Sequence, residues 1–164
     1  MFTQELFDMR PRVNFITYAL VAAAESRRLW PALVQEWTSK RVQNTKHGQS
    51  DEYVGSYTNS AYSLTINVYE DAPESLAFNV NSIPRQSARL RHYHYDTWTF
   101  LPDSRDDALK KGMEGFLHLS MLLLVFVRDK FGAISALEWD LQAGVCEGPA
   151  PGISTIVAPI RFSA

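Results

Sequence analysis

The stretch Tyr62-Ser63-Leu64-Thr65-Ile66-Asn67-Val68-Tyr69 decides the fold class. Apolar side chains occupy every second position from Tyr62 to Val68, with polar side chains or Tyr69 between them. Successive side chains of a strand point to opposite faces, so this period predicts a half-buried β-strand. Working outward, similar segments predict seven further strands, at residues 53–57, 76–81, 88–95, 97–101, 117–128, 134–140 and 154–162.

Turn-forming residues separate these segments, for example Thr58-Asn59-Ser60 and Glu70-Asp71-Ala72-Pro73. About eight short strands with tight connections predict a mainly β fold, either an up-and-down antiparallel barrel or a strongly curved sheet. Two longer polar or Gly/Pro-rich loops interrupt the pattern, at 102–115 and 142–152, and a helical turn is expected at 106–111. Loops of this length at the mouth of a barrel often control access to a pocket, and loops without such a role are at least as common.

The chain before residue 51 has a helical period instead. Its apolar residues recur every three or four positions and predict two helices, at 11–29 and 31–41, with Pro31 opening the second. We therefore expect a helical lead-in and linker at 1–50 and a barrel at 51–164, together one structural unit. The apolar stripe that ends in Trp30, Leu33 and Trp37 is expected to pack on the barrel or on a second copy of the chain, as a homodimer.

Composition excludes several classes of protein. Sixteen basic and eighteen acidic residues among 164 leave no broad basic field, so nucleic acid is not an expected partner. The longest apolar run, 121–127, is too short to cross a bilayer, so no membrane association is expected. Cys146 is the single cysteine, which excludes an internal disulfide and favours a reducing, cytoplasmic location.

The segment Leu90-Arg91-His92-Tyr93-His94-Tyr95-Asp96-Thr97-Trp98 carries the densest chemistry in the chain. In an unbroken strand, His92, His94, Asp96 and Trp98 share one face. Three hypotheses compete for this face. His-x-His with Asp96 or Glu138 would hold a metal; a His oriented by a carboxylate would transfer protons; and the same groups would tie strands together in a hydrogen-bonded network.

A second concentration of polar residues is Glu138-Trp139-Asp140. Inward carboxylates would pair with Arg89, Arg91 or a His; outward carboxylates, which we favour, would be solvated and leave Trp139 to fill the barrel. Motifs of covalent and metal catalysis are missing from the sequence, namely Ser-x-x-Lys, Gly-x-Ser-x-Gly and His-Glu-x-x-His. No metal and no cofactor is therefore expected.

Three stretches together resemble a known family: Tyr53-Val-Gly-Ser-Tyr57, the run from Leu90 to Trp98, and Ile160-Arg-Phe162. They look like the lipocalin-like C-terminal domain of β-lactamase-related serine hydrolases, the fungal members above all. The lead-in from Leu6 to Phe15 is similar to the last helix and linker of those enzymes. The Ser-x-x-Lys nucleophile of the family lies in its upstream domain, so the resemblance implies the barrel and not the hydrolase activity.

Two functions remain open. The first is a cofactor-independent isomerase or cyclase, pericyclases included, acting on a small hydrophobic natural-product intermediate of secondary metabolism; this rests on analogy with other small pocket folds. The alternative is a non-catalytic small-molecule-binding or accessory domain. For the enzyme, the expected catalytic residues are His92, His94 and Asp96. The expected substrate-binding residues are Tyr62, Phe78, Trp98, Glu138 and Trp139.

Overall fold

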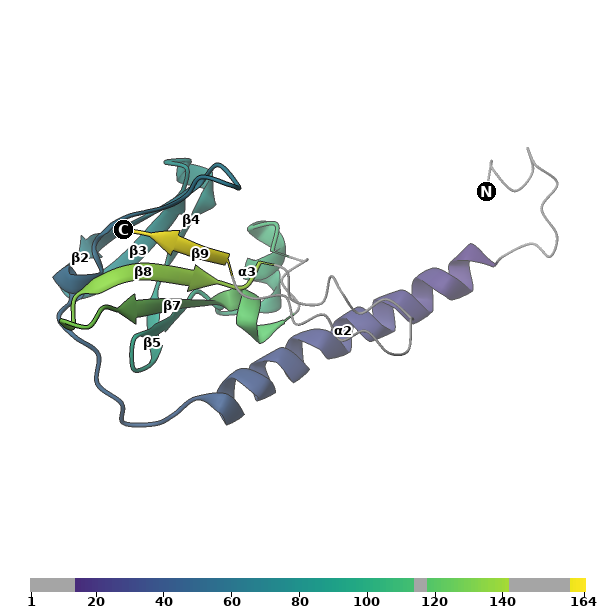
Figure 1. The fold of residues 1–164 in the computed structure, drawn as a ribbon. Helices are drawn as coiled ribbons and strands as arrows, with labels where there is room; N and C mark the ends of the chain where they lie inside the picture. Colours follow the sequence, from purple (N-terminus) through teal and green to yellow (C-terminus); the bar gives the residue numbers. More distant parts are fainter. Residues whose placement is uncertain (1–13, 114–117, 142–159) are drawn as a thin grey trace, which may run out of the picture.

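One antiparallel sheet curls into a nearly closed barrel (Figure 1). The computed structural model describes residues 14–113, 118–141 and 160–164. Its strands are β1 (Gly55–Asn59), β2 (Leu64–Ala72), β3 (Ser75–Val80), β4 (Ser87–Arg89), β5 (Arg91–His94), β6 (Thr97–Thr99), β7 (Leu123–Arg128), β8 (Ile134–Trp139) and β9 (Ile160–Ser163). Their order in the sheet is β4-β3-β2-β1-β9-β8-β7-β6-β5. The predicted mainly β barrel is confirmed, with nine described strands instead of about eight.

Four short helices lie before or between these strands in the described part of the chain. They are η1 (Ser50–Tyr53), η2 (Pro84–Gln86), α3 (Arg105–Lys110) and η3 (Leu119–Leu122). The helical turn expected at 106–111 is present as α3, which begins where the Ser104 hydroxyl accepts a hydrogen bond from Asp107 N at 3.1 Å.

The prediction of one continuous strand at 88–95 is wrong, because the chain forms two strands there, β4 and β5, with Leu90 between them. The first half pairs with β3 and the second with β6, so one bent stretch of chain serves two sides of the barrel. The predicted strand at 117–128 is also shorter than expected. Leu119 and Leu122 are buried three residues apart on the 3₁₀ turn η3, and the strand begins only at Leu123. Of the predicted strand 154–162, residues 154–159 lie outside the described residues.

The strand that decides the fold starts two residues later than predicted. Asn59 Oδ1 accepts a hydrogen bond from Tyr62 N at 3.2 Å, and Ser63 has a φ of +53°, so these residues form a turn. Tyr62 is consequently 52% exposed instead of half-buried in a strand. From Leu64 onward the alternation holds, since Ile66 and Val68 are buried.

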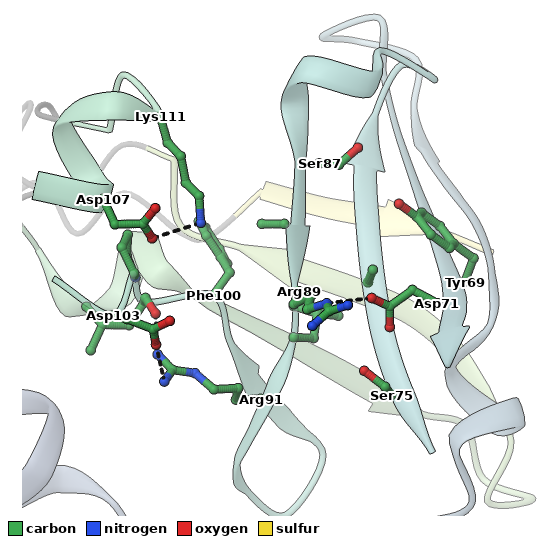
Figure 2. A pocket seen from close by; sticks show the side chains of 15 residues that line it. Tyr69, Asp71, Ser75, Ser87, Arg89, Arg91, Phe100, Asp103, Asp107 and Lys111 are labelled. Carbon is green, nitrogen blue, oxygen red and sulfur yellow. Dashed lines mark hydrogen bonds and ion pairs between the residues drawn. The ribbon is translucent and has the colours of Figure 1, made fainter. Parts of the chain in front are cut away.

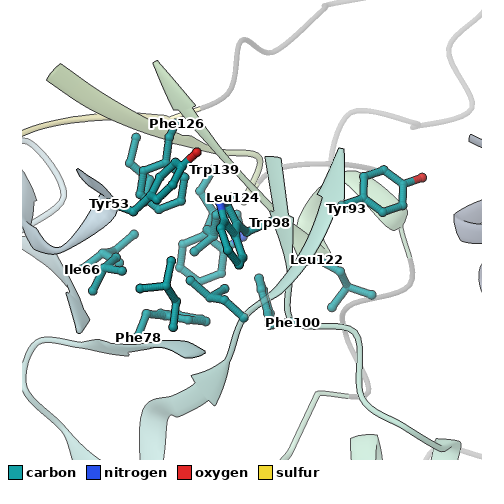
Figure 3. Close-up of a cluster of buried hydrophobic side chains, with 14 of the residues drawn as sticks. Tyr53, Ile66, Phe78, Tyr93, Trp98, Phe100, Leu122, Leu124, Phe126 and Trp139 are labelled. Atoms are coloured by element: carbon teal, nitrogen blue, oxygen red, sulfur yellow. The ribbon is translucent and has the colours of Figure 1, made fainter. Parts of the chain in front are cut away.

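Much of the barrel interior is filled by the chain's own side chains (Figure 3). Three aromatic rings lie side by side there: the ring centroid of Tyr53 is 5.3 Å from that of Trp98 and 5.0 Å from that of Phe126. The Tyr57 hydroxyl donates to Tyr53 O at 2.8 Å, which satisfies a buried polar group. Further fully buried members of this core are Ile66, Leu76, Leu124, Leu137 and Phe162.

The lead-in is one helix, α2 (Phe15–Lys40), so the predicted break at Pro31 is wrong. Asn14 caps it by accepting hydrogen bonds from Ile16 N and Thr17 N. A proline inside a helix leaves the carbonyl four residues earlier without a donor. Here that residue is Arg27, and both it and Pro31 are exposed, so water can bond the free carbonyl.

Only the C-terminal half of α2 packs on the barrel. Leu33 is 4% exposed, the ring of Trp37 lies 5.5 Å from that of Tyr93, and the Tyr93 hydroxyl donates to Trp37 O at 2.9 Å. The N-terminal half extends away from the barrel (Figure 1). Its exposed apolar side chains are Phe15, Ile16, Tyr18, Leu20 and Val21. Among the described helices, none has the length and apolar character needed to span a bilayer.

Candidate functional site

An apolar pocket of about 370 Å³ lies at one mouth of the barrel, and we call it the mouth pocket. Its floor is an aromatic triad, Phe78 of β3, Phe100 just after β6 and Trp139 of β8. Their ring centroids are 5.1, 5.6 and 6.0 Å apart in edge-to-face arrangements. The remaining lining residues are Leu64, Val80, Arg85, Gln86, Ser87, Ala88, Lys111, Gly112, Met113 and Leu141.

The alternation of side chains along β3 and β8 directs Phe78 and Trp139 of the triad into the barrel. Phe78 lies opposite Val68 in the β2–β3 ladder, and both are buried, so both point inward. Trp139 lies opposite Leu124 in the β7–β8 ladder, and its indole nitrogen donates to Met121 O at 2.8 Å. That hydrogen bond fixes the ring with its polar edge satisfied, and an aromatic wall of this kind suits an apolar ligand.

Two cationic side chains stand at the rim of the mouth pocket. Arg85 lies in η2 and is exposed; within the described part of the chain, no carboxylate forms an ion pair with it. Lys111 follows α3, and its Nζ lies 2.9 Å from Asp107 Oδ2. The hydrogen bond from Lys111 holds the pKa of Asp107 below its usual range. The rim therefore carries net positive charge beside an apolar floor.

A second depression, the polar groove, adjoins the mouth pocket and has a volume of about 580 Å³ (Figure 2). Ser87, Ala88, Phe100 and Lys111 line both. Besides the Lys111–Asp107 pair, the polar groove contains the ion pairs Arg89–Asp71 at 2.6 Å and Arg91–Asp103 at 2.9 Å. The mouth pocket and the polar groove thus form neighbouring apolar and charged halves of one surface region.

The predicted catalytic residues do not line the mouth pocket. A β-bulge between His92 and His94 breaks the face that they were expected to share, and Tyr95 and Asp96 form the turn before β6. The ring of His92 lies near those of Trp98 and His47, at 5.6 and 4.7 Å. The ring of His94 instead contacts Tyr93 and Tyr95, and its buried Nδ1 has no hydrogen-bond partner among the described residues.

Asp96 belongs to a hydrogen-bonded network that joins three parts of the chain. It accepts from the Tyr53 hydroxyl at 2.6 Å and from Nε and Nη2 of Arg128 at 3.0 and 2.9 Å. Arg128 also pairs with Glu52 at 2.7 Å. The Arg128 guanidinium lowers the pKa of Asp96, so this carboxylate is charged and fully engaged. The geometry matches the network hypothesis for Asp96 better than that of a general base.

The other predicted substrate-binding residues divide between the mouth pocket and elsewhere. Phe78 and Trp139 form its floor, whereas Trp98 is buried in the core and Tyr62 lies in the β1–β2 turn. Glu138 faces Arg161 of β9 at 3.8 Å, away from the mouth pocket. No three His, Cys, Asp or Glu side chains converge in a metal-binding arrangement within residues 14–113, 118–141 and 160–164.

Sequence reasoning missed Phe100, Arg85 and Lys111 as members of the site. Phe100 was expected only as one aromatic residue of a strand. Arg85 and Lys111 lie in connecting segments, where no period indicates which way a side chain points. The one sequence feature that could have indicated Lys111 is the long polar loop 102–115, because it brings this residue to the barrel mouth.

These features define a small antiparallel barrel with a ligand-sized pocket at its mouth. The family described as "Domain of unknown function (DUF3471)" matches residues 39–147, more than half of the chain and all strands from β1 to β8. The chain therefore belongs to this family. No curated protein and no solved structure matches it.

The histidines of β5 predict a pH dependence of stability. Burial lowers the pKa of His92 and of His94, and the neighbouring His47 and Arg41 lower that of His92 further. Below pH 6.5, the usual pKa of histidine, the unfolded chain binds more protons than the folded chain does. The free energy of unfolding therefore decreases as the pH is lowered. We expect a lower urea midpoint at pH 5.5 than at pH 7.5.

The variant His92→Asn should show a smaller loss between these two pH values. The matched control is His118→Asn, which changes an exposed histidine and should keep the wild-type loss. A urea midpoint of the wild-type chain that stays constant or rises on acidification would contradict the burial of these imidazoles.

Proposed function

We propose that this domain is a non-catalytic binding module whose mouth pocket takes a compact apolar group that carries an anionic end. The observation that supports this most is the pairing of the Phe78–Phe100–Trp139 floor with Arg85 and Lys111 at the rim. An apolar concave surface with a few polar groups at its edge is the usual form of a small-ligand site. We place the module in the cytoplasm, because its single cysteine fits a reducing compartment.

The energetics predict weak affinity for a small ligand. Removing about 150 Å² of apolar ligand surface from water contributes roughly 4 kcal/mol. A charge-assisted hydrogen bond to a rim cation adds about 1.5–3 kcal/mol. Because association costs at least about 4 kcal/mol of lost translational and rotational freedom, the net gain is roughly 1.5–3 kcal/mol, which corresponds to a dissociation constant on the order of 10 mM.

The resemblance to a C-terminal domain of β-lactamase-related hydrolases supports the same proposal. In that family the reaction belongs to another domain, so the barrel has an accessory role. A core that is filled largely by its own side chains, with the mouth pocket at one end, is consistent with a module that binds one small group.

A cofactor-independent isomerase or cyclase at the mouth pocket is the second candidate. The observation that favours it is Lys111, because a cation beside aromatic walls stabilises negative charge that develops on a reacting molecule. His92, His94 and Asp96 would not take part in such a reaction. A ligand recovered unchanged after incubation supports binding alone, and an isomer of the same mass supports the enzyme.

The binding proposal is tested with 2-naphthoate as the probe and its neutral amide as a comparison, by calorimetric titration of the wild-type chain. We expect the acid to bind about tenfold more tightly than the amide, because one charge-assisted hydrogen bond is worth about 1.4 kcal/mol or more. Lys111→Met should reduce this difference, and the double variant Arg85→Met/Lys111→Met should remove most of it.

The control is Lys130→Met, whose ammonium lies over Phe131 outside the mouth pocket and which should bind like the wild type. Equal affinities of acid and amide would refute the role of the rim cations. The absence of binding by either probe would refute the proposed site.

A further inference from the structure

The barrel leaves one sheet edge unpaired beside the mouth pocket. Strand β4 pairs with β3 alone and β5 with β6 alone, so the sheet ends at these two strands. The β5 edge is covered, because the Arg41 guanidinium donates to Tyr93 O and His92 O, and Tyr95 N donates to Thr45 Oγ1. The β4 edge borders the polar groove instead.

The ladder shows which backbone groups of β4 face outward. Leu90 N donates to Leu76 O at 2.7 Å, and Ala88 lies opposite Phe78 in the same register. The N–H and C=O of Ala88 and Leu90 therefore point toward β3, and those of Ser87 and Arg89 point away from it. Among the described residues, no backbone partner is present for the groups of Ser87 and Arg89.

The chain's own strand β6 does not close this edge. The pairing of Arg91 with Thr99 would bring Leu101 opposite Arg89 if the ladder continued. Leu101 N donates to Thr99 Oγ1 at 3.2 Å, the Leu101 carbonyl accepts from the Arg91 guanidinium, and Pro102 has no N–H. The backbone groups that would extend the ladder are thus already used, and the polar groove occupies the place of the missing strand.

The side chains on the two faces of β4 determine which side chains would suit a strand added beside it. Ala88 shares the inward face of Phe78, so a residue added beside Ala88 points its side chain into the mouth pocket. The residues before and after it point outward, where Arg89 and Arg91 lie (Figure 2). The side chain of Arg89 is 77% exposed and that of Arg91 is 48% exposed, so both guanidinium groups can reach a further carboxylate beside their present partners Asp71 and Asp103.

We infer that the β4 edge accepts an extended peptide by strand addition, with a bulky apolar side chain in the mouth pocket and acidic side chains on both sides of it beside Arg89 and Arg91. This inference rests on the proposed function and names its ligand as a peptide. Strand addition at a free sheet edge is a recurring mode of peptide recognition, in which main-chain hydrogen bonds give affinity and alternate side chains give specificity.

The probe is the blocked peptide acetyl-Thr-Glu-Phe-Glu-Thr-amide, compared with the same peptide N-methylated at its three central residues. Methylation removes the donors of an added strand and keeps every side chain. We expect at least a tenfold loss of affinity on methylation, and a similar loss when the central Phe is replaced by Ser. Peptide binding should also slow the amide exchange of Ser87 and Arg89.

The matched protein variants are Arg89→Pro and Arg89→Ala. Proline at this position removes an N–H that faces the polar groove and no hydrogen bond to β3. Arg89→Pro should therefore bind the peptide at least tenfold more weakly than Arg89→Ala, while both bind 2-naphthoate equally. If Arg89→Pro does not fold, the methylated peptide tests the same donors on the wild-type chain.

The two proposals fail separately. Equal affinity of the methylated and unmethylated peptides, or no peptide binding by a chain that binds 2-naphthoate, overturns the strand addition and leaves the mouth pocket as a small-molecule site. A chain that binds neither probe overturns both.

Discussion

Replacing Leu33 with alanine should lower the free energy of unfolding by about 2–4 kcal/mol, and the same replacement at Leu20 by less than about 0.5 kcal/mol. Both leucines lie in α2, but Leu33 is 4% exposed against the barrel and Leu20 is 67% exposed. Because helix propensity changes equally at both positions, the difference reports packing alone. Urea unfolding of both variants at low protein concentration measures it.

The pair of variants also tests the expected homodimer. If a second copy covers the N-terminal half of α2, then Leu20→Ala should become destabilising as protein concentration rises, since association stabilises the folded chain. Equal destabilisation by both substitutions at low concentration would contradict the finding that only the C-terminal half of α2 packs on the barrel.

Asp96→Ala should cost about 2–3 kcal/mol of stability, because it leaves the partly buried Arg128 without its bidentate partner and the Tyr53 hydroxyl without an acceptor. The matched control is Asp103→Ala. Its carboxylate also pairs with an arginine but is 87% exposed, so the expected loss is below about 1 kcal/mol.

Thermal unfolding of the two variants in parallel decides between a structural and a catalytic Asp96. If Asp96 is instead a catalytic carboxylate whose position lowers stability, the Asp96→Ala variant should be as stable as the wild type or more stable. That outcome would revive the acid–base hypothesis for this residue.

The strands were predictable where one face is buried and the other is solvated. Between Leu64 and Val68 the period of two follows directly from burial of alternate side chains. Prediction failed where local hydrogen bonds override the period. Leu90 ends one ladder and starts another, and the Tyr62–Asn59 contact turns the chain before β2 begins. Pro31 lies inside a helix because packing of Leu33 and Trp37 outweighs one lost hydrogen bond.

Of the candidate site, only the aromatic residues Phe78 and Trp139 could be predicted from the sequence. Phe78 and Trp139 lie on regular strands, so their inward direction follows from the alternation. The polar residues were not predictable in the same way. One bulged residue in β5 separates His92 from His94, and the partner of Asp96, Arg128, lies 32 positions away in the sequence. Nothing in a single sequence indicates that these two side chains meet.

Intermolecular nuclear Overhauser effects between 2-naphthoate and the tryptophan indoles test the mouth pocket most directly. Trp139 lies on its floor, whereas Trp98 is buried in the core among Tyr53, His47 and His92. We predict strong effects from the naphthyl protons to Trp139, and none to Trp98. Effects to Trp98 and the β5 histidines, with none to Trp139, would contradict the account and move the site to the His92 region.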